Sequence, residues 1–167
     1  MTTLDLLPPA TSLPPPGESL ELLQGLGRLH AAGPLVVTLY LRLDGEARVR
    51  NRYRLAGRDA IRRAREMADQ LGLTHSDREA LHRDLARVEA QLTNASALPH
   101  SPGLVLFACE SLSLFQLLPL PRALETRLLI GDRPRLAEAR AAVEQFGRIL
   151  VALVDRTQCR FIEVTAF

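Results

Sequence analysis

Alternating apolar residues mark one segment of the chain as a β-strand, Leu35-Val-Val-Thr-Leu-Tyr-Leu-Arg-Leu43. Successive side chains of a strand point to opposite faces, so residues two apart share a face. Turn-forming pairs bound the segment, with Gly33-Pro34 before it and Asp44-Gly45 after it. The pattern therefore predicts a strand with one apolar face, made of Leu35, Val37, Leu39, Leu41 and Leu43.

Helical periodicity replaces the alternation after this strand. Apolar residues recur at spacings of three and four, which predicts a helix over 53–71 and a second helix from about Ser76. Gly72 ends the first helix, and Ser76-Asp-Arg-Glu79 fits a capping box for the second. The positions expected to be buried are Ile61, Ala64, Ala68 and Leu71, then Leu81, Leu85, Val88 and Leu92.

The whole order of elements predicts an α/β fold: a mixed β-sheet with a helical hairpin inserted after the first strand, helices packed on the sheet, and a C-terminal β-hairpin. The other expected elements are a helix at 19–30, strands at 104–109, 112–118 and 126–130, a helix from Asp132 to Phe146, and hairpin strands at 149–154 and 159–165, the first of them of a buried type.

Proline content separates the start of the chain from this domain. Residues 1–17 hold five of the eleven prolines, and each proline fixes φ and removes a hydrogen-bond donor. We therefore expect a flexible lead-in at 1–17, an α/β domain at 18–146 and a separate hairpin at 147–167. A lone hairpin is marginally stable, so its outer edge needs a partner.

Composition excludes several classes of protein. The 167 residues carry a net charge of +2, and all 21 basic residues are arginine, a bias typical of a GC-rich genome. No apolar run approaches the roughly 18 residues of a membrane span, and the N-terminus lacks the features of a signal peptide. Cys109 and Cys159 fit buried apolar positions in a reducing compartment. The expectation is a cytoplasmic protein with no membrane association.

Catalytic patterns are missing from the sequence. His75 and His82 lie seven residues apart, but no cysteine or carboxylate completes a metal site with them, and there is no glycine-rich phosphate loop or nucleophile elbow. We therefore predict no catalytic residue, no metal and no cofactor, and expect a protein that binds rather than an enzyme.

Arginine is concentrated directly after the first strand. Residues 46–65 carry eight arginines against Glu46 and Asp59, a net charge of +6. Guanidinium groups pair with phosphate oxygens and release counterions, so this cluster predicts contact with a nucleic-acid backbone. Alternation over 48–54 would place four of them on one side of an extended segment. The predicted RNA-binding residues are Arg48, Arg50, Arg52, Arg54, Arg58, Arg62 and Arg65.

A second interpretation of the cluster is a solvated surface, partly neutralised by Asp59 and Glu66. Tyr53 is the one aromatic residue among the arginines, so the cluster lacks a platform for stacking bases. The RNA interpretation requires that the arginines are neither buried nor held by acidic neighbours.

The order of segments resembles the N-terminal domain of archaeo-eukaryotic class-one peptide-chain release factors, and more closely their bacterial release-factor-like relatives. The resemblance spans about 18–167 and lies in Leu35–Leu41, the helical hairpin, Pro102–Cys109, Gly131-Asp-Arg-Pro134 and Ile149–Arg156. It implies an α/β domain that faces the decoding centre of the ribosome, followed by the first hairpin of a middle domain.

The sequence departs from that family at its functional motifs. The family's middle domain carries Gly-Gly-Gln, which positions water to hydrolyse peptidyl-tRNA, and this chain has no such triplet. The stop-codon loop Asn-Ile-Lys-Ser is replaced by Gly72-Leu-Thr-His-Ser-Asp77, and the Tyr-x-Cys-x-x-x-Phe element has no counterpart. None of the family's functional residues is therefore carried over.

Two hypotheses of function remain. The first is a translation-associated module that contacts ribosomal RNA or tRNA phosphates, in termination or ribosome rescue. The second is a self-associating interaction domain without a nucleic-acid role, a homodimer formed through the edge of the C-terminal hairpin. Peptidyl-tRNA hydrolysis by this chain itself is disfavoured, because no nucleophile or water-positioning group can be named.

Overall fold

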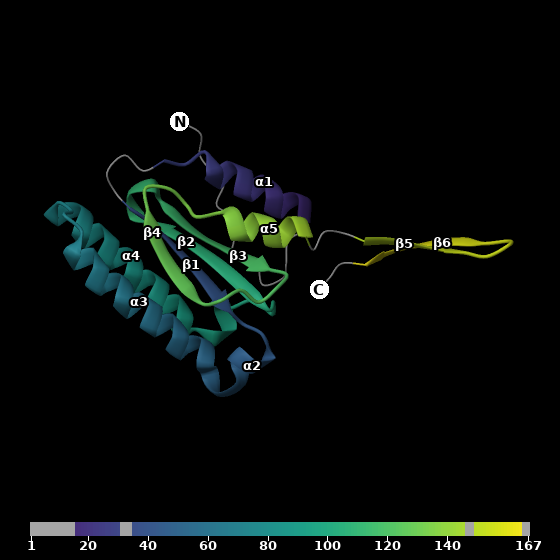
Figure 1. Cartoon of the computed structure of the whole chain (residues 1–167), viewed down its shortest axis with the longest axis horizontal. Coiled ribbons are helices and arrows are strands. Elements are labelled where there is room, and N and C mark those ends of the chain that lie inside the picture. Colours follow the sequence, from purple (N-terminus) through teal and green to yellow (C-terminus); the bar gives the residue numbers. More distant parts are fainter. Residues whose placement is uncertain (1–15, 31–34, 146–148, 165–167) are drawn as a thin grey trace.

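Four strands form one antiparallel sheet in the order β3-β2-β1-β4 (Figure 1). The computed structural model describes residues 16–30, 35–145 and 149–164. β1 pairs with β2 on one side and with β4 on the other, so it lies inside the sheet, and β3 is an edge strand. The strands are β1 (Val36–Arg42), β2 (Gly103–Cys109), β3 (Leu114–Leu120) and β4 (Arg127–Gly131).

Helices cover both faces of this sheet (Figure 1). The hairpin of α3 (Arg52–Gln70) and α4 (His75–Thr93) lies on one face, and α1 (Pro16–Gly27) and α5 (Ala137–Gln145) lie on the other. β1 contributes to two apolar cores, because its side chains alternate: Leu39 and Leu41 join the core with α3 and α4, and Val36 and Tyr40 join the core with α1 and α5.

The predicted α/β fold class is confirmed, including the helical hairpin after the first strand and the C-terminal β-hairpin. The sheet was expected to be mixed, but all of its strand pairs are antiparallel. The apolar face predicted for the strand is confirmed, and its second face is also buried. Three of the four positions predicted for α3 are buried, whereas Leu71 is 41% exposed because the helix ends at Gln70. All four positions predicted for α4 are buried.

Several boundaries differ from the prediction. Thr74, not Ser76, caps α4, and its Oγ1 accepts a hydrogen bond from the backbone N–H of Asp77 at 3.1 Å. α1 begins at Pro16, inside the predicted lead-in, because a proline loses no hydrogen bond in a first helical turn. Residues 1–15 of that lead-in lie outside the described residues, and so does Phe146. The strand expected at 112–118 is β3, shifted by two residues.

α5 begins at Ala137, five residues later than predicted, because β1 holds the preceding segment. The backbone N–H of Arg135 donates to Thr38 Oγ1 at 3.1 Å, and the Tyr40 hydroxyl donates to the Arg135 carbonyl at 2.6 Å. Ala139 N–H donates to the same hydroxyl at 3.3 Å. These tertiary bonds keep Asp132 outside the helix.

The C-terminal hairpin of β5 (Ile149–Val154) and β6 (Cys159–Val164) extends away from the sheet (Figure 1). The expectation of a buried strand at 149–154 is wrong for the described side chains, 151–154, which are all exposed. The large apolar side chains exposed on the two strands are Val151, Leu153, Val154, Phe161 and Ile162.

Candidate nucleic-acid interface

The arginine cluster lies on α2 (Gly45–Arg48), a single 3-10 turn at Val49–Asn51, and α3 as far as Arg65. The prediction of an extended segment at 48–54 is therefore wrong, because these residues lie in helices and a 3-10 turn. Asp44 starts α2, because its Oδ1 accepts a hydrogen bond from Ala47 N–H at 2.9 Å. Arg50 (φ 56°) and Asn51 (φ 55°) then take left-handed conformations, which redirect the chain into α3.

Arg48 points into the protein rather than toward a partner. Its Nε donates to the Leu43 carbonyl at 2.8 Å, and one terminal nitrogen donates to the Pro99 carbonyl at 2.5 Å and lies 3.5 Å from the Ser101 carbonyl. The guanidinium thus joins the end of β1 to the loop that leads into β2. This arginine has a structural role in the fold.

Arg54 and Arg65 connect the two helices of the hairpin. Arg54 donates to the Thr93 carbonyl at the end of α4 at 2.8 Å, and Arg65 pairs with Glu89 of α4 at 2.8 Å. Both guanidinium groups therefore stabilise the packing of α3 on α4 and are less available to an external phosphate.

Arg52 and Arg62 are exposed and weakly paired. The Arg52 side chain is 59% exposed and lies 3.2 Å from Glu46 Oε1. The Arg62 side chain is 64% exposed and lies 3.5 Å from Asp59 and 3.3 Å from Glu66. Exposed ion pairs of this kind contribute about 0–1 kcal/mol, so a phosphate can replace the carboxylate at little cost.

Arg50, Arg58 and Arg63 are exposed and have no hydrogen-bond or ion-pair partner within the described residues. Arg63 belongs to the cluster but not to the set of contacts predicted from sequence. The structure thus separates the cluster into residues that hold the fold together and an outward-facing set. We call this outward-facing set the α3 arginine surface; it consists of Arg50, Arg52, Arg58, Arg62 and Arg63.

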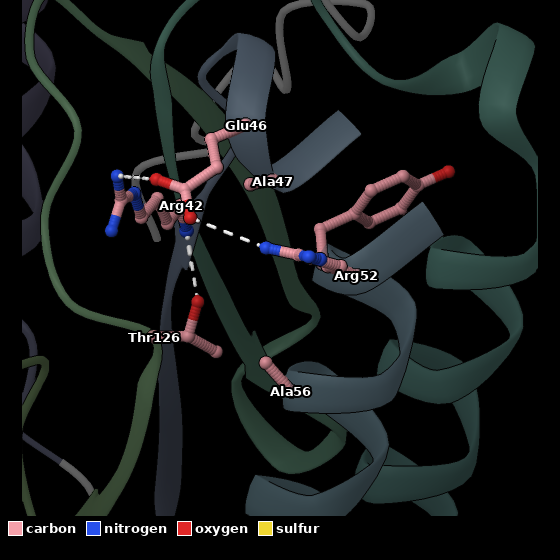
Figure 2. A pocket seen from close by; sticks show the side chains of 7 residues that line it. Arg42, Glu46, Ala47, Arg52, Ala56 and Thr126 are labelled. Carbon is pink, nitrogen blue, oxygen red and sulfur yellow. Dashed lines mark hydrogen bonds and ion pairs between the residues drawn. The ribbon is translucent and has the colours of Figure 1, made fainter. Parts of the chain in front are cut away.

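A small pocket of about 140 Å³ adjoins this surface where β1 ends (Figure 2). The Glu46 carboxylate bridges two arginines across it, with Oε2 3.1 Å from an Arg42 nitrogen and Oε1 3.2 Å from Arg52. The Arg42 backbone N–H donates to the Thr126 hydroxyl at 3.0 Å. The sequence prediction missed Arg42, because it falls inside the strand pattern.

Asp44 holds the Arg42 side chain in place through an ion pair of 2.7 Å. The Ala47 N–H and then Arg42 hold the pKa of Asp44 below its usual range, and the hydrogen bond to Asp44 raises the pKa of Arg42. We expect Asp44→Asn, which preserves a capping side chain, to lower the free energy of unfolding at neutral pH. Because the folded-state pKa is depressed, this difference should shrink as the pH falls below about 4, in urea unfolding followed by circular dichroism.

Asp84 provides the opposite case on α4. It is 1% exposed, one oxygen accepts from Glu110 N–H at 2.9 Å, and the other has no partner within the described ranges. Burial raises the pKa of this carboxyl, so the contribution of Asp84 to the stability of the wild type should fall as the pH rises above about 4. In the same assay Asp84→Asn should become steadily more favourable than the wild type over that rise. A difference that does not change with pH would contradict this assignment.

Neither metal-binding clusters nor membrane-spanning helices occur in the part of the chain that the structure describes. No three His, Cys, Asp or Glu side chains lie close enough together there to hold a metal ion. None of the described helices has both the length and the apolar character needed to cross a bilayer.

Comparison with known proteins finds similarity in structure but not in sequence. No protein-family model and no curated protein sequence matches the chain. A solved structure named only as an archaeal protein superposes with a TM-score of 0.59 at 19% identity, covering 93% of this chain and 46% of the other. The archaeal translation termination factor aRF1 superposes with a TM-score of 0.57 at 19% identity, covering 93% of this chain and 45% of the other. The fold is release-factor-like.

This likeness extends over the described domain and is one of fold. The chain spans less than half the length of either solved structure. The α3 arginine surface runs from Arg50 to Arg63, so it begins at the end of the helical hairpin that lies opposite the 72–74 connection (Figure 1). The 19 residues of α3 separate the two ends by about 28 Å.

Proposed function

We propose that this protein is a release-factor-like, translation-associated binding module that contacts ribosomal RNA or tRNA phosphates through the α3 arginine surface. The observation that carries the proposal is the group of three exposed arginines, Arg50, Arg58 and Arg63, without partners among the described residues. Arg52 and Arg62 add two guanidinium groups in exposed ion pairs that a phosphate can replace.

The chemistry of such a surface favours the nucleic-acid backbone over the bases. Tyr53 is 4% exposed and its hydroxyl accepts a hydrogen bond from Arg54 at 3.1 Å, so its ring is not available for stacking. Guanidinium groups bind phosphate oxygens without reading sequence. Under this proposal the module works in the cytoplasm as a binding unit, in termination or ribosome rescue, and residues 147–167 form a hairpin separate from the 18–146 domain.

Sedimentation with bacterial ribosomes and binding to purified tRNA test the proposal. Five phosphate contacts predict that affinity falls about 100-fold between 50 and 200 mM salt, because the displaced counterions must return. Binding with that salt dependence to ribosomes or tRNA is the expected result. Absence of binding at 50 mM salt, or binding that does not respond to salt, would reject the function.

Self-association is a second candidate function, favoured by the exposed hairpin. Val151 and Ile162 lie opposite each other on one face, and Ala152 and Phe161 on the other. Phe161 is 67% exposed. An isolated two-stranded ribbon is marginally stable in water, and its free edges can pair with a second copy. Light scattering should then give twice the 18.4 kDa chain mass, and Phe161→Glu should give the monomer. A monomeric wild type at micromolar concentration would eliminate this candidate.

A further inference from the structure

The pocket at the end of β1 has the donor arrangement of a phosphate site. Two guanidinium groups approach it from different elements, Arg42 from β1 and Arg52 from α3 (Figure 2). Thr126 lines the opposite wall, and its hydroxyl, which accepts from Arg42 N–H, still has its own hydrogen to donate. Ala47, Tyr53 and Ala56 complete the lining, together with Glu46 between the two arginines.

Glu46 occupies the place of an anion in this arrangement. Each of its two carboxylate oxygens faces one guanidinium, at 3.1 and 3.2 Å. The side chains are 66% exposed for Glu46, 47% for Arg42 and 59% for Arg52, so the carboxylate can leave into water without breaking the core. Inorganic or terminal phosphate offers more acceptor oxygens and more charge than a carboxylate. A backbone phosphodiester matches the carboxylate, with one negative charge shared by two oxygens, and both kinds of phosphate can form paired hydrogen bonds with arginine.

Asp44 fixes one side of the pocket. It holds Arg42 Nε at 2.7 Å, while a terminal nitrogen of the same guanidinium faces Glu46. Removal of the Glu46 carboxylate therefore leaves Arg42 oriented, and leaves the two pocket arginines with one acidic partner, Asp44, instead of two.

We propose that this pocket binds one phosphate group between Arg42 and Arg52, with Thr126 as a third donor, and that Glu46 is an internal competitor that the phosphate displaces. The inference rests on the proposed function, since a nucleic-acid phosphate is the group expected to reach the pocket. It adds Arg42 and Thr126 to the arginine surface and gives Glu46 a regulatory role: its carboxylate sets how readily the pocket accepts an anion.

Titration with inorganic phosphate tests the pocket directly, with binding followed by NMR shifts of the whole chain at low ionic strength. Glu46→Gln should bind phosphate at least fivefold more tightly than the wild type, because the competing charge is gone. Arg52→Gln should bind at least fivefold more weakly. Glu66→Gln is the matched control, because it removes one negative charge as Glu46→Gln does. Glu66 lies on α3 and, among the described residues, pairs with Arg62 and with neither pocket arginine. An equal gain in both glutamate variants, or no gain in Glu46→Gln, would overturn the proposal.

Binding experiments with RNA identify the source of the phosphate and separate this inference from the proposed function. A short single-stranded RNA is compared with and without a 5′-phosphate, on the wild type and on Glu46→Gln. A gain in Glu46→Gln for both RNAs assigns the site to backbone phosphates, and a gain for the phosphorylated RNA alone assigns it to a terminal phosphate. If Glu46→Gln binds inorganic phosphate more tightly but the protein binds neither ribosomes nor tRNA, the phosphate pocket is supported and the proposed function is rejected. If the protein binds ribosomes but Glu46→Gln binds inorganic phosphate no more tightly than the wild type, the proposed function is supported and the phosphate pocket is rejected.

Discussion

Replacing Arg48 with alanine is expected to lower the free energy of unfolding by about 3 kcal/mol. The guanidinium donates to the carbonyls of Leu43 and Pro99 and approaches that of Ser101. Hydrogen bonds from a charged donor are each worth roughly 1.5–3 kcal/mol, and their loss leaves half-buried carbonyls without partners. Urea unfolding at neutral pH, followed by circular dichroism, measures the change.

Lysine is not expected to restore this stability. Arg48 uses Nε and a terminal nitrogen toward carbonyls on two different segments, and a single ammonium cannot reproduce that planar fork. Arg58→Ala is the control, because Arg58 is exposed and without a partner among the described residues, and it should change stability by less than about 0.5 kcal/mol. If Arg48→Ala were as stable as Arg58→Ala, the structural role assigned to Arg48 would be wrong.

The elements that were predictable from sequence are those whose pattern reflects burial. The alternate apolar residues of β1 were predictable because the face that they form packs on the helical hairpin. The three-and-four spacing in α4 reflects its one buried stripe. The late start of α5 was not predictable, because it depends on backbone hydrogen bonds to the hydroxyls of Thr38 and Tyr40, about 100 residues earlier in the chain.

The division of the arginine cluster was hidden from sequence for the same reason. The partner carbonyls of Arg48, at Pro99 and Ser101, lie about 50 residues away, and a count of charges cannot reveal them. The left-handed conformation of Arg50 also had no signal in the sequence, since arginine rarely adopts φ 56°, although Asn51 beside it is a residue type that tolerates such a conformation. The sequence showed only the total charge of the segment, and a prediction from that charge counted more exposed, unpaired guanidinium groups than the structure has.

The triple variant Arg50→Gly, Arg58→Gln and Arg63→Gln is expected to bind ribosomes or tRNA about 100-fold more weakly at 50 mM salt, at roughly 1 kcal/mol per lost phosphate contact. The slope of log affinity against log salt should fall by about 2. The free energy of unfolding of the triple variant should not be lower than that of the wild type, although its binding is weaker. Glycine relieves the left-handed strain at Arg50, and the other two side chains make no hydrogen bond or ion pair with described residues.

A second triple variant controls for net charge: Arg28→Gln, Arg140→Gln and Arg160→Gln. Both triples change the net charge from +2 to −1, but Arg28 directly follows α1, and Arg140 and Arg160 lie on α5 and β6. These elements lie away from α3 (Figure 1). If binding depends on the local array of guanidinium groups, the control keeps most of its affinity and its salt slope, because α1 and α5 cover the opposite face of the sheet. Equal losses in the two triples would mean that overall charge attracts the RNA and that the α3 arginine surface has no special part in binding.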